Sequence, residues 1–93
     1  MSTSCETERT VTIANRYGLH ARPAAEFVKL ASTFQSDVMV RKDDLEVNGK
    51  SIMGMMMLAA EFGSAITIRT AGADAPAAAD ALADLVARRF GEE

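Results

Sequence analysis

GLHARPAA, the sequence of residues 18–25, contains the only histidine of the 93-residue chain. Pro23 fits the first turn of a helix, where backbone N–H groups have no intrahelical partner. Because a residue before proline disfavours the α region, Arg22 leaves a later helix start open. Apolar residues then recur at helical spacing, which predicts a helix over residues 21–33: Ala24, Phe27, Val28, Ala31 and Phe34. We therefore expect His20 at or beside the N-terminus of a helix.

This predicted helix start is a suitable place for an anion. The free N–H groups of Ala21 and Arg22, together with the positive end of the helix dipole, would point towards a group bound there. Arg22 adds a fixed positive charge, and its planar guanidinium matches phosphate oxygens. Near neutral pH much of the imidazole is unprotonated, so a ring nitrogen of His20 can attack phosphorus. The residues suggest a phosphoryl-accepting site, and a histidine with no chemical role is the alternative.

A second motif, NGKSIMG, covers residues 48–54. Asn48-Gly49 predicts a turn, and Ser51 is a good N-cap for a short helix over residues 52–60. Four methionines fall within this helix, at positions 53, 55, 56 and 57. A helix of under three turns cannot bury all of them on one face, so some should be exposed, as at sites of partner binding. The alternative, a stripe of core residues, is expected for about half of these side chains.

The rest of the chain predicts an α+β fold. Alternating apolar residues predict strands over residues 10–14, 37–42, 45–47 and 65–71. Asp74 is the expected N-cap of a third helix, with Leu82, Leu85 and Val86 inward. The order β-α-β-β-α-β-α implies a four-stranded antiparallel sheet covered on one face by three helices. We expect residues 1–8 to form a flexible tail and residues 9–93 a single domain.

Composition narrows the function classes. The net charge of −3 argues against a general nucleic-acid binder. One histidine and one cysteine, Cys5, do not provide the ligand spacing of a metal site. A single cysteine also excludes an internal disulfide, and this fits a reducing compartment such as the cytoplasm. No apolar run is long enough to insert into a membrane, and the first residues do not look like a signal peptide.

Residues 18–24 resemble the active-site signature of HPr, the histidine-containing phosphocarrier family of the bacterial phosphotransferase system. Residues 48–54 resemble that family's regulatory serine segment and lie about 30 residues later, as the family's layout requires. The resemblance extends from about Arg9 to Arg89. It implies that the fold is an open-faced β-sandwich. It also implies that His20 accepts phosphate on Nδ1, although the sequence itself does not distinguish the two ring nitrogens.

The resemblance implies a phosphoryl carrier, not an enzyme. The carrier would receive its phosphate from Enzyme I, charged by phosphoenolpyruvate, and pass it to an enzyme IIA component. Arg22 would stabilise charge on the transferred group, and the Ala21 and Arg22 amides would bind its oxygens. No cofactor or metal is expected, and a carrier that docks with many partners is expected to be a monomer.

The resemblance also assigns a regulatory and a docking region. Ser51 matches the serine that an HPr serine kinase/phosphorylase modifies in some members, although an ordinary N-cap serine is the alternative. Ile52, Met53 and Met56 match the family's partner-docking surface. A paralogue of the nitrogen-related branch and a regulatory module that transfers no phosphate are the other functions considered. The presence of His20 with Arg22 argues against the latter.

Overall fold

The computed structural model describes residues 6–92 of the chain. Its elements are β1 (Glu6–Thr12), α1 (Ala21–Ala31), β2 (Asp37–Lys42), β3 (Leu45–Asn48), α2 (Ile52–Met57), β4 (Ala65–Ala71), α3 (Ala75–Ala87) and a final 3₁₀ turn, η1 (Arg89–Gly91). The predicted order of strands and helices is confirmed.

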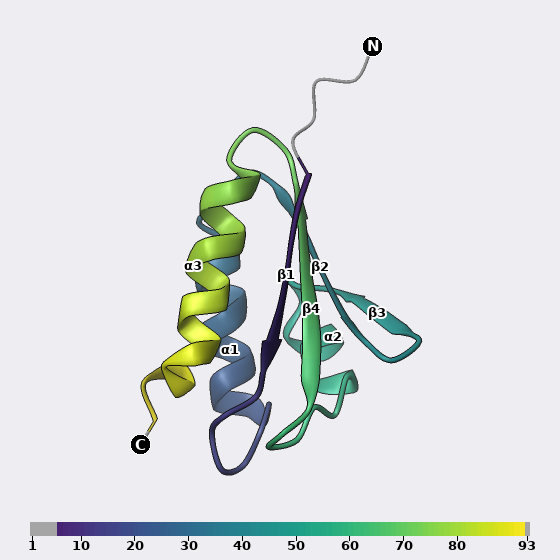
Figure 1. Cartoon of the computed structure of the whole chain (residues 1–93), viewed down its shortest axis with the longest axis vertical. Coiled ribbons are helices and arrows are strands. Elements are labelled where there is room, and N and C mark those ends of the chain that lie inside the picture. Colours follow the sequence, from purple (N-terminus) through teal and green to yellow (C-terminus); the bar gives the residue numbers. More distant parts are fainter. Residues whose placement is uncertain (1–5, 93) are drawn as a thin grey trace.

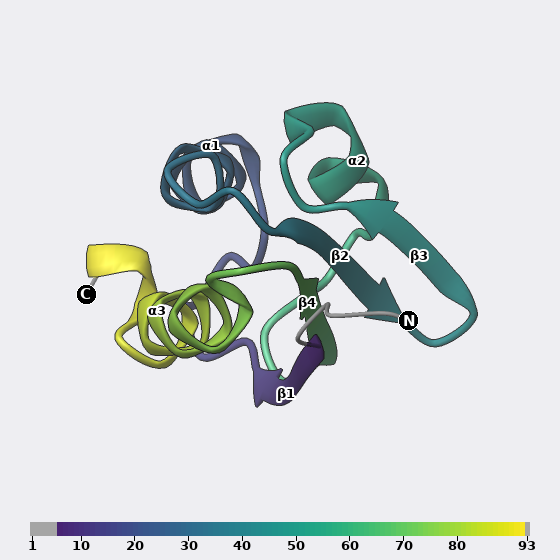
Figure 2. The ribbon, with the colours of Figure 1, turned by 90° about the horizontal axis from the view of Figure 1, so that it is seen from above.

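The four strands form one antiparallel sheet in the order β1-β4-β2-β3. The helices lie on one face of this sheet, with α1 beside α3 and α2 packed near β3 (Figure 1, Figure 2). The loop between β1 and α1 lies at the same end of the molecule as the end of α3 (Figure 1). The predicted open-faced sandwich is confirmed, and its topology places the β1–α1 loop close to the end of α3.

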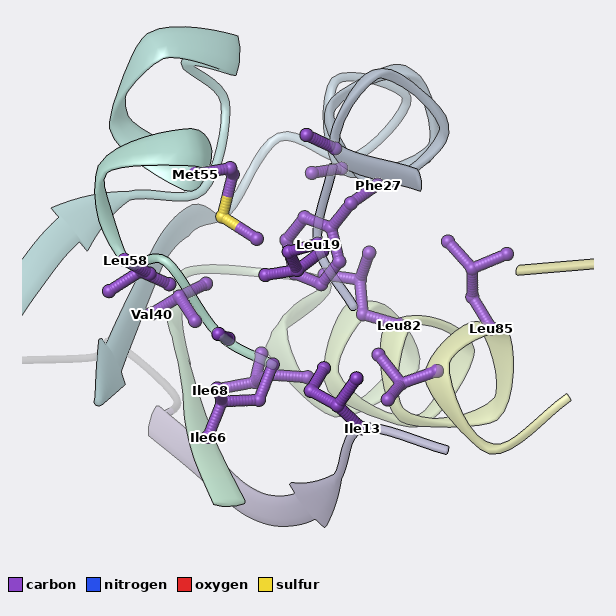
Figure 3. Packing of buried hydrophobic residues seen from close by; sticks show 14 of the residues in the cluster. Ile13, Leu19, Phe27, Val40, Met55, Leu58, Ile66, Ile68, Leu82 and Leu85 are labelled. Atoms are coloured by element: carbon purple, nitrogen blue, oxygen red, sulfur yellow. The ribbon is translucent and has the colours of Figure 1, made fainter. Parts of the chain in front are cut away.

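The core lies between the sheet and the helices. Alternate residues of β2 and β4 point inward, which is the period-two pattern of a strand with one buried face. Figure 3 shows how the large side chains meet. The fully buried ones include Ile13, Phe27, Val40, Met55, Ile66, Ile68 and Leu82. The three predicted inward residues of α3 are also buried.

The predicted boundary of the N-terminal tail is wrong. Strand β1 begins at Glu6, where it pairs with Ala71 of β4, so residues 6–8 belong to the sheet. The pattern missed them because most side chains of this strand, at the edge of the sheet, are polar and exposed. The remainder of the predicted tail, including Cys5, lies outside the described residues.

Helix ends also differ from the predictions. Helix α1 begins at Ala21, so Arg22 is helical despite preceding Pro23, and the helix ends at Ala31, two residues early. Helix α2 ends at Met57, because Ala59 adopts a left-handed φ of 49° that α-helix cannot continue through.

Asp74 occupies the N-cap position of α3, but its side chain does not cap that helix. Its carboxylate accepts hydrogen bonds from the Ser36 hydroxyl and from the backbone N–H groups of Gln35 and Ser36. The Ser36 hydroxyl and the Gln35 amide lower the pKa of Asp74, since both bonds favour the ionised carboxylate. Asp74 therefore ties the start of α3 to the turn after α1.

Candidate functional site

His20 is the N-cap residue of α1, which confirms the expected position at the start of a helix. Its backbone is extended, with φ −79° and ψ −173°, and its side chain makes no capping hydrogen bond. The His20 carbonyl accepts the first helical bond, from the N–H of Ala24. The imidazole is 42% exposed, so its ring is held at the protein surface and is free to react with a partner.

The loop before His20 is fixed by the segment after α2. Gly18 has a left-handed φ of +68°, and a Cβ atom there would lie 2.5 Å from the Ala60 carbonyl oxygen. The N–H of Leu19 donates to that same oxygen at 2.8 Å, and the Leu19 side chain is buried. Only glycine can adopt this φ without strain and also approach the Ala60 carbonyl this closely, because it has no Cβ. The contact therefore fixes the position of His20 and of the start of α1.

The start of α1 presents unpaired hydrogen-bond donors. Within residues 6–92, the N–H groups of Ala21 and Arg22 have no acceptor, as expected for the first turn of a helix. The Arg22 side chain is exposed and has no carboxylate partner in the described part of the chain. An open hollow adjoins these groups and is lined by Arg16, Tyr17, His20, Arg22, Gly91 and Glu92. His20 and Arg22 therefore line one hollow, and the two unpaired amides directly follow His20 in the first turn of α1.

A carboxylate that was not among the predicted site residues lies against His20. Glu92 Oε2 is 3.3 Å from His20 Nε2, and Glu92 Oε1 accepts a hydrogen bond of 3.1 Å from Asn15 Nδ2. Glu92 follows the last helix, so no local pattern links it to a histidine 72 positions earlier in the sequence. Only the end of α3 folding back to the β1–α1 loop brings the two together.

Tyr17 and Arg16 extend the site outward. The Tyr17 ring is 73% exposed and stands edge-on to His20, with the ring centroids 6.3 Å apart. The Arg16 guanidinium lies 6.0 Å from the centroid of the Tyr17 ring, within cation–π range. A partner that approaches His20 would therefore meet an aromatic ring and two arginines.

Ser51 is the N-cap of α2, as predicted, and its Oγ accepts a hydrogen bond of 3.0 Å from Gly54 N. The three predicted docking residues are exposed: Ile52, Met53 and Met56. Met57 and Phe62 are also exposed, whereas Met55 is fully buried in the core. No hydrogen bond or ion pair in the described residues joins Ser51 to His20, and the two residues occupy the N-cap positions of different helices.

The part of the chain that the structure describes, residues 6–92, has neither a cluster of metal ligands nor a helix that could span a membrane. It contains no cluster of histidine, cysteine and acidic side chains arranged to hold a metal ion. None of its helices has the length and apolar character needed to cross a membrane.

Known proteins resemble this chain over most of its length. A family model described as "PTS HPr component phosphorylation site" matches residues 7–88. Phosphocarrier protein HPr of Neisseria meningitidis serogroup B is 51% identical over 85 residues, which covers 91% of this chain and 96% of that protein. HPr of Cupriavidus necator is 49% identical over 85 residues, with the same coverage.

Solved structures agree with the sequence comparisons. A crystal structure of HPr from Thermoanaerobacter tengcongensis has a TM-score of 0.90 at 48% identity and covers 94% of this chain and 98% of that one. Another crystal structure from that organism is described as an HPr dimer. Proteins named NPr and HPr-like Crh are also among the relatives. The family model and these relatives span nearly the whole domain, and the chain belongs to the HPr family of phosphocarriers of the phosphotransferase system.

Proposed function

We propose that this chain accepts a phosphoryl group on His20 from Enzyme I and passes it to an enzyme IIA component. The observation that carries the proposal is the placement of an exposed imidazole at the N-cap of α1, beside two unpaired amides and Arg22. A helix N-terminus stabilises phosphate through its free N–H groups and its dipole. The proposal includes no role as an enzyme: the chain would be a covalent intermediate between two other proteins.

The groups around His20 suit phosphoryl transfer. A ring nitrogen of His20 forms a bond to phosphorus while the bond between phosphorus and the donor's leaving atom breaks, and the reverse step charges the acceptor. Such transfers depend mainly on positioning and on neutralising the oxygens of the transferred group. Arg22 and the amides of Ala21 and Arg22 supply that neutralisation with no need for a metal ion.

The exposed side chains of α2 suit partner docking. Ile52, Met53 and Met56 offer an apolar surface of flexible residues on a helix that follows the Ser51 cap. Methionine-rich surfaces adapt to several partners, as a carrier that meets both a donor and an acceptor requires. We expect the chain to act as a monomer at this surface and to work in the cytoplasm.

Phosphorylation of Ser51 by an HPr serine kinase/phosphorylase would regulate docking. A phosphate there would add roughly −1.5 to −2 charges at the start of α2. The fold would tolerate this charge because anions are favourable at a helix N-terminus. The charge would instead disfavour the burial of Ile52 and Met53 against a partner.

The test is phosphorylation of the purified chain with phosphoenolpyruvate and Enzyme I, read as an added phosphate by intact mass. We expect an acid-labile phosphate on the wild type and none on His20→Ala, with circular dichroism showing that both are folded. Wild-type protein that takes up no phosphate under these conditions would overturn the proposal. It would favour a regulatory module, which Ser51→Ala would then test with ATP and a serine kinase.

Arg22 can be tested against a matched arginine. Arg22→Ala should slow phosphorylation of His20 by about 10- to 100-fold, because removal of one charge-stabilising group costs about 1–3 kcal/mol. Arg41, an exposed arginine of β2, is the control, and Arg41→Ala should leave the rate unchanged. Equal rates for the two variants would exclude a role for Arg22 in stabilising the transferred group.

A further inference from the structure

We propose that Glu92, anchored by Asn15, is a positioning residue that holds the His20 proton on Nε2 and so leaves the lone pair on Nδ1. This inference rests on the proposed function, in which His20 is the phosphoryl acceptor. The observation behind it is the contact of 3.3 Å between His20 Nε2 and Glu92 Oε2. A carboxylate at that distance favours an N–H on the nitrogen that it faces, because two lone pairs would repel each other.

Asn15 fixes the position of the Glu92 carboxylate. Its side chain is fully buried, and its Nδ2 donates to the Gly18 carbonyl at 2.8 Å and to Glu92 Oε1 at 3.1 Å. Both neighbours are acceptors, so only the amide nitrogen of Asn15 can face them. One oxygen of Glu92 is thus held by a buried donor, and the other is left to meet the imidazole.

The backbone that follows α3 forms a turn that places Glu92 beside His20. Arg89, Phe90 and Gly91 all have left-handed φ values, of 59°, 57° and 78°. The chain turns here, with backbone bonds from Gly91 N to Arg88 O and from Glu92 N to Arg89 O, and the buried Phe90 packs this turn against the core. Left-handed backbone is costly for Arg89 and Phe90, and such strain persists only where the surrounding structure compensates for it. Here the result of the turn is a carboxylate, 21% exposed, placed beside the reactive ring.

The carboxylate would also stabilise the product of the transfer. When the Nδ1 lone pair forms the bond to phosphorus, the donor's bond to phosphorus breaks and the ring of His20 becomes positively charged. The Nε2 proton stays in place, and the negative charge of Glu92 faces the new positive charge. An aspartate has this orienting and charge-stabilising role towards the histidine of serine protease triads. Contacts that are loose in a free protein often tighten during the reaction.

The first experiment reads the tautomer directly. His20 is the only histidine, so ¹⁵N–¹H correlation spectra of an untagged, ¹⁵N-labelled chain at alkaline pH report one imidazole. We expect the Nε2–H tautomer to predominate in the wild type and the Nδ1–H fraction to rise at least threefold in Glu92→Ala. Glu92→Gln keeps an oxygen that can accept from Nε2–H and should lie between the two. Glu8→Ala removes an exposed carboxylate of β1 and should resemble the wild type.

The second experiment measures phosphorylation of the same variants by Enzyme I. We expect Glu92→Ala to lower the maximal rate by about 10-fold with little change in KM, the lower end of the range found when a metal-bound histidine loses the partner of its second ring nitrogen. Glu92→Gln should recover part of the rate, and Glu8→Ala all of it. An unchanged tautomer ratio, or an equal or faster rate for Glu92→Ala, would overturn the inference. A wild type that Enzyme I does not phosphorylate would overturn the proposed function instead, because the spectra report on Glu92 without any donor.

Discussion

Replacement of Gly18 by alanine should destabilise the fold more than its small size suggests. The left-handed φ of Gly18 would cost alanine about 1–2 kcal/mol. The new Cβ would also lie 2.5 Å from the Ala60 carbonyl oxygen and 2.9 Å from the Glu61 Cα, so backbone must move. That movement would weaken the bond from Leu19 N to Ala60 O, worth about 1 kcal/mol. We expect the free energy of unfolding to fall by about 2–4 kcal/mol and Tm by roughly 10–25 °C.

Gly63 provides the matched control. It also has a left-handed φ, of +89°, but no atom lies within 4 Å of the position that a Cβ would take. Gly63→Ala should therefore show only the backbone cost of about 1–2 kcal/mol. Urea and thermal unfolding of both variants, with phosphorylation of His20 as a second measurement, compare the two effects. Equal losses of stability would refute the argument that close contact between the two loops holds the start of α1.

Three further predictions concern stability. Asp74→Asn should lose more stability at pH 6 than at pH 2, because the lowered pKa of Asp74 stabilises the fold above about pH 3.8 and this contribution declines as the pH falls towards the lowered value; urea unfolding at both pH values measures the difference. Met55→Ala should cost about 2–5 kcal/mol in urea unfolding, whereas Met53→Ala, at a side chain 75% exposed, should change stability by under about 0.5 kcal/mol. Ser51→Ala should cost about 0.5–2 kcal/mol by loss of the N-cap bond to Gly54, whereas Ser51→Asp keeps an acceptor and should melt near the wild-type temperature.

The sequence predicted those strands and helix starts that are determined by residues close together in the chain. The strands over residues 37–42 and 65–71 have the predicted bounds, because one buried face imposes a strict alternation of apolar residues. The starts of α1 and α2 follow from His20-Ala21 and Ser51, where the backbone changes from extended to helical. The extent of β1 was missed because its partner β4, and not its own pattern, defines it.

The candidate site was predictable only in part, for the same reason. His20, Ala21 and Arg22 are neighbours in sequence, so their placement together follows from one helix start. Asn15 and Glu92 are 77 residues apart, and each alone looks like an ordinary surface residue. The turn that joins them uses left-handed φ at Arg89 and Phe90, residue types that give no sequence signal for it.

The loop after α2 connects this proposed docking helix rigidly to the segment that carries His20. That loop is bonded to the segment before His20 at three points: Leu19 N to Ala60 O, Gly63 N to Ile13 O and Ile13 N to Ser64 O. A partner seated on α2 would therefore be held in a fixed position relative to the imidazole, and phosphoryl transfer depends steeply on such positioning. Ser51 lies at the far end of α2 from this loop and shares no bond with His20. A charge on Ser51 would thus affect how a partner docks, whereas the proposed roles of Glu92 and Arg22 concern the reaction of His20 after the partner has docked.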